Sequence, residues 1–306
     1  MILNSLDNVT FRLNEHHDLS WLKKYGTAFT VFDETGSGCI GIGMENNGKK
    51  VFCKIAGVNT VFAEIPPQES VEALKKALTV YSDLRHPNLI KLIEHYPYDR
   101  FYVAVFEWEN GDCLFDHWNF EKYYSENSTI KSPKEKFYEL PIKEKLKTAD
   151  VLFSFLKLAA NKGYTAVDFY DGSIIYDFET GKTVICDVDL FMKRPIVNTM
   201  GEKWWGTKRV KAPEEYILGA DIDEQTNVFT LGALLFDFFG SFTNEDIERR
   251  YRDNRFVPCG IEHWQLDEIR YRALIKAVNL DRNKRYKTIS QFWDSWKIGL
   301  TFKNNC

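Results

Sequence analysis

Two aspartates that flank a predicted hairpin are the residues of this chain whose types and spacing best suit a chemical role. Asp168 precedes an apolar run at 173–176, and Asp187 follows a second apolar run at 183–186. Residues 179–182 predict a turn, so the two runs pair as neighbouring strands. That geometry brings both carboxylates to one edge of a small sheet. Phosphoryl transfer uses such a pair, with one carboxylate holding Mg²⁺ and the other orienting the attacking hydroxyl.

The elements that must position these carboxylates fall into a sheet-rich part and a helical part. Alternating residues and two glycine-marked turns between 28 and 56 predict a three-stranded meander, and a helix with apolar residues along one side follows at 69–84. Further strands are predicted at 89–93 and 101–106, and helices at 143–162, 226–239, 265–278 and 288–299. This order predicts an α+β fold.

Length, composition and net charge limit the classes of protein to which the chain can belong. The chain has 306 residues, of which 44% are hydrophobic and 15% aromatic, which is ample for a sizeable core. A net charge of -4 provides no strong field for nucleic acid or an anionic membrane, so neither is expected as a partner.

Cysteine spacing and the N-terminus indicate the compartment. The 6 cysteines form no CxxC pair, so neither a zinc site nor a disulfide framework is predicted, and free thiols fit a reducing cytosol. The first residues lack a signal pattern, and no apolar run approaches the length of a membrane span. A soluble, cytoplasmic protein is expected.

The segment 165–214 resembles the catalytic and activation segments of the eukaryotic-type Ser/Thr protein kinase family. Asp168 falls at the aspartate of the His-Arg-Asp motif and Asp187 at that of Asp-Phe-Gly. Gly206-Thr207 and Ala212-Pro213-Glu214 match the end of the activation segment. The resemblance implies a bilobal fold with a β-rich N-lobe at 28–108 and a helical C-lobe at 109–306, after an N-terminal extension at 1–27.

The resemblance also implies ATP and Mg²⁺ as cofactors. Lys54, in V-F-C-K, takes the position of the lysine that neutralises the nucleotide phosphates. Gly36 and Gly38 mark a turn whose backbone would approach the phosphates, and Ile40 would lie over the base, although an ordinary hairpin explains this turn equally well.

Four more positions belong to the implied nucleotide site. Phe106 is the implied gatekeeper, and the backbone groups of Glu107 and Glu109 would bind adenine. Ile175 is the fourth of these nucleotide-site positions.

The chain departs from the family around the lysine and in the catalytic loop. Ala77 stands where the lysine's glutamate partner is usual, so Glu72, or else Glu64, is expected to pair with Lys54. Ala166 and Val167 replace the family's His-Arg.

Two further departures concern the loop's charge and its metal ligands. Tyr170 replaces the catalytic-loop lysine, and Ser173 replaces an asparagine that binds the second Mg²⁺, with Asp171 as a possible substitute ligand. Asp189 gives an Asp-x-Asp pattern that resembles aminoglycoside and choline kinase-like enzymes. The expected metal ligands are therefore Asp187, Ser173 and Asp189.

Two scaffold roles follow from the same resemblance. Glu214 is expected to pair with Arg285, and Asn227 to cap a helix.

Three functions stay open from the sequence. The first is ATP- and Mg²⁺-dependent phosphorylation of Ser/Thr hydroxyls in a protein substrate, with Asp168, Asp187 and Lys54 as the working residues. The second is a pseudokinase that acts as a nucleotide-binding or scaffold module, favoured by Ala77, Ala166 and Val167. The third is a small-molecule kinase of the aminoglycoside-kinase-like type.

Overall fold

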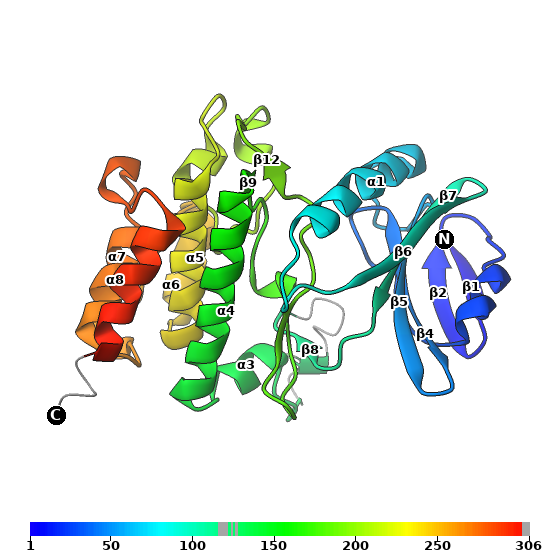
Figure 1. The fold of residues 1–306 in the computed structure, drawn as a ribbon, viewed down its shortest axis with the longest axis horizontal. Helices are drawn as coiled ribbons and strands as arrows, with labels where there is room; N and C mark the ends of the chain where they lie inside the picture. Colours follow the sequence, from blue (N-terminus) through cyan, green and yellow to red (C-terminus); the bar gives the residue numbers. More distant parts are fainter. Residues whose placement is uncertain (116–121, 124, 126–127, 302–306) are drawn as a thin grey trace. The chain divides into compact units, whose positions relative to one another are not determined.

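The computed structural model describes residues 1–115, 122–123, 125 and 128–301 (Figure 1). The chain divides into two compact units, of which the first is Met1–Asn110 and the second holds the described residues from Gly111 onward. Strands and helices are both present, as the predicted α+β class requires.

A five-stranded antiparallel sheet forms the centre of the first unit, with strand order β3-β4-β5-β7-β6. The strands are β3 (Thr27–Phe32), β4 (Cys39–Asn46), β5 (Lys49–Ala56), β6 (Leu92–Tyr98) and β7 (Phe101–Glu107). The predicted meander is confirmed as β3, β4 and β5. The strand predicted at 89–93 begins only at Leu92.

One face of this sheet is covered by the chain's first residues. An antiparallel hairpin of β1 (Ile2–Leu6) and β2 (Val9–Leu13) and a short 3-10 helix, η1 (Ser20–Tyr25), share a core with β4, β5 and β7. Phe11, Leu13 and Leu22 are buried in that core. Residues 1–27 are therefore part of the first unit, and the sequence missed their hairpin.

Helix α1 (Pro67–Asp83) packs on β5 and β7 and begins at Pro67, whose fixed φ suits a first helical turn. Its buried residues include Leu74, Ala77 and Tyr81. The Tyr81 ring lies 5.0 Å from that of Phe106 on β7. The predicted helix at 69–84 is confirmed.

The second unit is mainly helical. Its helices are α3 (Pro133–Tyr138), α4 (Ile142–Asn161), α5 (Glu224–Phe239), α6 (Asn244–Arg252), α7 (Glu268–Ala277) and α8 (Ile289–Thr301). Helices α4, α5, α7 and α8 pack against one another, as Figure 1 shows. Helix α5 is apolar on nearly every side because it is buried among its neighbours.

Short elements connect these helices. The strands are β8 (Asp112–Cys113), β9 (Tyr164–Thr165), β10 (Ile174–Tyr176), β11 (Thr183–Ile185) and β12 (Met192–Lys193). The 3-10 helices are η2 (Asp171–Ser173), η3 (Gly201–Lys203), η4 (Pro213–Tyr216), η5 (Ile261–His263) and η6 (Arg282–Lys284).

Each unit has at least one buried free cysteine among the described residues. Burial raises the pKa of Cys53 in the first unit to about 12 and that of Cys259 in the second to about 11. None of the helices in the described ranges has both the length and the apolar character that crossing a membrane requires.

Candidate active site

The predicted hairpin forms in the second unit from β10 and β11. Ile174 pairs with Ile185 and Tyr176 with Thr183, and the Cys186 N–H donates to the Ser173 carbonyl at 3.0 Å. Asp168 and Asp187 therefore sit at the same end of the hairpin. Their charges interact, because the Asp187 carboxylate helps to raise the pKa of Asp168.

Asp168 occupies a strained backbone position with a φ of 54°, which is uncommon for any residue other than glycine. Burial, and then the charge of Asp187, raises the pKa of the Asp168 carboxyl to about 6. The Thr207 hydroxyl donates a 3.1 Å hydrogen bond to Asp168 Oδ1 and opposes that rise. The carboxylate is thus oriented, and its pKa lies close to neutral pH.

Asn227 holds the loop that carries Asp168. Its side-chain Oδ1 accepts from the Ala166 N–H at 2.8 Å, and its Nδ2 donates to the Ala166 carbonyl at 2.7 Å. The prediction that Asn227 caps a helix is wrong, because the capping residue of α5 is Asp223.

Lys211 lies near Asp168 and Glu215. Burial lowers the pKa of its ammonium group, although the negative charge of Asp168 favours the protonated form. Its buried ammonium donates to the Trp204 carbonyl at 2.5 Å and the Glu202 carbonyl at 3.5 Å. Its positive charge opposes the rise in the Asp168 pKa.

Glu215 is a buried carboxyl near Lys211. Burial raises its pKa to about 8, although Oε2 accepts a 2.7 Å hydrogen bond from the Ala212 N–H. The side chain is therefore largely protonated at neutral pH.

Asp171 is enclosed in a buried ionic network. Arg209 Nη2 lies 2.6 Å from Oδ1 and Nη1 lies 3.0 Å from Oδ2, so Arg209 contacts both carboxylate oxygens. Arg209 also contacts Asp237, which pairs with Arg250 at 3.0 Å. The expectation that Asp171 could replace a metal ligand is wrong, because Arg209 already neutralises it.

One carboxylate of the acidic pair suits a magnesium ion. Mg²⁺ is usually held by one or two carboxylates together with substrate phosphates. Asp187 is exposed at the end of the hairpin, so its carboxylate would supply one such ligand.

A second ion does not fit the predicted ligands as well. Ser173 is fully buried, and its hydroxyl accepts a long 3.5 Å hydrogen bond from the Tyr170 N–H. Its assignment as a metal ligand stays a prediction. In the part of the chain that the structure describes, no group of three His, Cys, Asp or Glu side chains could hold a metal. The role of Asp189 stays a prediction.

Lys54 lies on β5 of the first unit, between Gly41 on β4 and Ala104 on β7. Its predicted partner does not pair with it. The Glu72 carboxylate is mostly exposed and lies 2.7 Å from the Lys75 ammonium, one turn away on α1. Ala77, which stands at the position of the family's glutamate, is buried and has no charge that could pair with Lys54.

Ile40 was expected over the nucleotide base, and this prediction is wrong. Ile40 is fully buried in the core beneath β1 and β2, together with Ile55. Its neighbour Gly41 lies in register with Lys54, and side chains alternate between the two faces of a strand. Ile40 therefore faces away from Lys54.

Aromatic rings cover the sheet face that carries Lys54. A Cβ on Gly41 would lie 2.6 Å from the Phe52 ring, so glycine is needed for this ring to pack. Phe52 lies 6.0 Å from Phe32 and 6.3 Å from Phe106 between ring centroids. The predicted gatekeeper, Phe106, is thus buried in an aromatic cluster.

The glycine-marked turn is tied to the segment before α1. The Glu64 N–H donates to the Gly36 carbonyl at 2.9 Å, and the Thr60 hydroxyl donates to the Thr35 carbonyl at 3.2 Å. Gly38 has a φ of 70°, which favours glycine. Phosphate binding by this turn stays a prediction.

The implied adenine contacts also stay predictions. The Glu107 N–H donates to the Lys91 carbonyl at 2.9 Å, and the side chains of these residues form an ion pair. Glu109 follows β7 and is partly buried. Ile175 is partly buried on β10, where it pairs with Cys113.

The predicted ion pair between Glu214 and Arg285 is confirmed. The guanidinium binds both carboxylate oxygens, at 2.7 and 3.0 Å. Burial raises the pKa of Glu214, but Arg285 outweighs it and keeps the pKa below its usual value.

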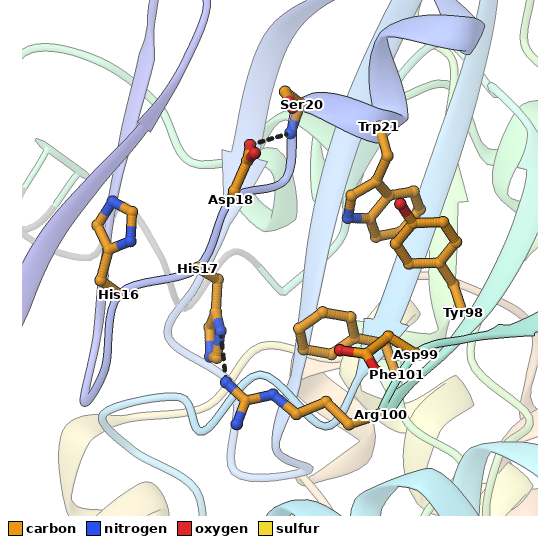
Figure 2. A pocket seen from close by; sticks show the side chains of 9 residues that line it. All are labelled: His16, His17, Asp18, Ser20, Trp21, Tyr98, Asp99, Arg100 and Phe101. Carbon is orange, nitrogen blue, oxygen red and sulfur yellow. Dashed lines mark hydrogen bonds between the residues drawn. The ribbon is translucent and has the colours of Figure 1, made fainter.

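An open pocket of about 490 Å³ lies elsewhere in the first unit (Figure 2). Its lining residues are His16, His17, Asp18, Ser20, Trp21, Tyr98, Asp99, Arg100 and Phe101. The guanidinium of Arg100 can only donate to His17 Nδ1, at 2.8 Å, so Nε2 carries the proton and donates to the Val58 carbonyl at 3.1 Å. None of the predicted site residues lines this pocket.

The sequence missed the functional contacts of Thr207, Lys211 and Phe52. Thr207 was noted only as part of a motif, and Lys211 had no assigned role. The signal for Phe52 was Gly41, because a glycine in a strand often marks close approach by another group.

Comparisons with known proteins give a distant relationship. No family model matches the chain. The chain is 23% identical over 235 residues to "Calcium-dependent protein kinase 5" of Plasmodium berghei (strain Anka), a stretch that is 73% of this chain. It covers 38% of that protein, so the chain spans well under half of its relative's length. This weak similarity indicates a protein-kinase-like relationship.

Proposed function

We propose that the protein transfers the γ-phosphoryl group of ATP to Ser or Thr hydroxyls of a protein substrate. The observation that carries this proposal is the interacting pair of Asp168 and Asp187 at one end of the hairpin. The distant similarity to a protein kinase supports it. The G-T and A-P-E segments and the formed pair of Glu214 with Arg285 favour a protein over a small molecule as the acceptor.

Asp168 accepts the hydrogen of the acceptor hydroxyl and orients its oxygen for attack. Thr207 fixes the direction of the Asp168 carboxylate, and Asn227 fixes the backbone beneath it. Asp187 would hold Mg²⁺, which when bound neutralises charge on the transferred phosphoryl group. Lys54 would neutralise the other phosphates.

The test is transfer of labelled γ-phosphate from Mg²⁺·ATP to the protein itself and to a generic protein substrate. Asp168→Asn should lower the rate by about 100-fold or more, because general base catalysis typically contributes that much. Asp187→Asn should abolish transfer and leave folding intact. The control is Asp294→Asn, at an exposed position on α8.

Retained labelling in folded Asp187→Asn would sink its assignment as the metal ligand. Equal labelling by wild type, Asp168→Asn and Asp294→Asn would sink the role of Asp168.

A pseudokinase is the second candidate, and the aromatic cover beside Lys54 favours it. The rings of Phe52, Phe32 and Phe106 lie on the face that a nucleotide held by Lys54 would need. Folded wild-type protein that gains thermal stability with Mg²⁺·ATP but transfers no label to any substrate would support this alternative.

A further inference from the structure

The segment from Gly201 to Lys211 ends beside Asp168 and is strongly basic. It contains four cations, Lys203, Lys208, Arg209 and Lys211, and a single carboxylate, Glu202. Thr207 contacts Asp168 at 3.1 Å, so the next residue in the chain, Lys208, lies close to the proposed acceptor position.

The four cations divide into two kinds. Arg209 is buried against Asp171, and Lys211 is buried against backbone carbonyls. Lys203 and Lys208 are exposed, and no carboxylate among the described residues forms an ion pair with either of them. Their charges are therefore available to a partner.

An exposed apolar patch lies next to this segment. Its members are Val197, Met200, Trp205, Ile217 and Leu218, and Leu218 is 70% exposed. Val197 and Met200 lie on one stretch and Ile217 and Leu218 on another. These stretches are hydrogen-bonded, from the Gly219 N–H to the Asn198 carbonyl at 2.8 Å and from the Asn198 N–H to the Ala220 carbonyl at 2.9 Å. Trp205 follows η3, whose first residue, Gly201, lies beside Leu218. Clustered exposed apolar side chains of this kind mark interaction surfaces.

We propose that this surface of the second unit, Lys203 and Lys208 with the apolar patch, binds an acidic peptide segment that presents the acceptor Ser or Thr. Acidic residues beside the hydroxyl face the two lysines, and apolar residues farther along cover Trp205 and Leu218. A basic segment is rejected by like charge. The identification of this peptide as a phosphoryl acceptor rests on the proposed function, whereas its binding does not.

Equilibrium binding tests the surface without requiring transfer. The probe is a short fluorescein-labelled peptide with one Thr, flanking Glu residues and two Leu residues, and its matched form has Lys in place of each Glu. The acidic form should bind wild type at least about tenfold more tightly, and added salt should reduce the difference.

Lys208→Glu should remove most of that preference, and Leu218→Ser should weaken both peptides' binding. Lys287→Glu, an exposed position after η6, makes the same charge change elsewhere and should leave the preference intact. Equal binding of the two peptides to wild type, or a preference unchanged in Lys208→Glu, overturns the proposal.

Transfer to the same two peptides separates this proposal from the proposed function. Acid-selective binding without transfer supports the docking surface and contradicts phosphoryl transfer. Transfer to both peptides at equal rates with equal binding supports phosphoryl transfer and overturns acid selection.

Discussion

The Asp168 carboxyl has a pKa raised to about 6 by burial and by Asp187. It must be ionised to accept a proton, so kcat/KM should fall about tenfold per pH unit below about 6. Because kcat/KM reports the ionisations of the free enzyme, initial rates at low substrate concentration and constant ionic strength give this acidic side of the pH–rate profile.

Thr207 provides the matched variant for this pH dependence. Its hydrogen bond favours the ionised form of Asp168, so Thr207→Val should raise the Asp168 pKa and move the acidic fall in kcat/KM to higher pH. An acidic fall in kcat/KM at the same pH in the variant, or no fall in rate between about pH 7 and 5, would contradict Asp168 as the proton acceptor.

Glu215 gives a prediction about stability. Its pKa is about 8 when folded against an ordinary value of 4.5, so the folded state binds the proton more tightly. The resulting stability is fully present below about pH 4.5 and is lost as pH rises towards 8.

Glu215→Gln removes this loss and keeps an oxygen acceptor for the Ala212 N–H. The free energy of unfolding of the variant should be about 4 kcal/mol higher than that of wild type at pH 8, with little difference at pH 4.5. Urea unfolding at both pH values measures the difference, with exposed Glu248→Gln as the control. The same gain at both pH values would mean that titration of Glu215 is not the cause.

At the scale of elements, the aromatic cover on β5 and β7 limits what can approach Lys54. Phe52→Ala removes the ring above Gly41. We expect Mg²⁺·ATP to bind the variant about tenfold more tightly than wild type, because the base no longer competes with the ring.

The nucleotide-induced rise in Tm measures this effect. Phe62→Ala, at a residue that is 52% exposed, is the control. An unchanged or smaller rise in folded Phe52→Ala would show that the ring helps to bind the base instead of excluding it.

Several elements could be predicted from the sequence because their signals are local. Helices α1 and α4 have apolar residues at helical spacing, α5 has a long apolar run, and the β10–β11 hairpin has two apolar runs around a turn. The pairing of Glu214 with Arg285 followed from the family resemblance.

The errors at the candidate site have non-local causes. Ile40 was placed on the wrong face because a one-residue offset reverses the direction of every side chain in a strand. Asp171 was expected to be free for a metal, but it pairs with Arg209. Glu72 was expected to pair with Lys54, but it pairs with Lys75. The β1–β2 hairpin was missed because its strands have only 5 residues each and mix polar with apolar side chains.

At the scale of the whole molecule, the first residues complete the core of the first unit. Phe11 on β2 is 2% exposed in that core. Phe11→Ala should lower the free energy of unfolding by about 3–5 kcal/mol, which is the usual cost of removing a buried aromatic ring.

Chemical unfolding followed by circular dichroism measures this change. Thr10→Ala, at an exposed position of the same strand, should cost less than about 1 kcal/mol. Equal losses in both variants would mean that the hairpin contributes little to the core.

The buried thiols also make the chain a reporter of its own local opening. Cys53 and Cys259 have raised pKa values and lie one in each unit, so alkylating reagents reach their thiolates only when the surrounding structure opens. Mass spectrometry of timed labelling would therefore give a separate opening rate for each unit from one sample. Repeating it with Mg²⁺·ATP or with the acidic peptide would show which unit each ligand protects.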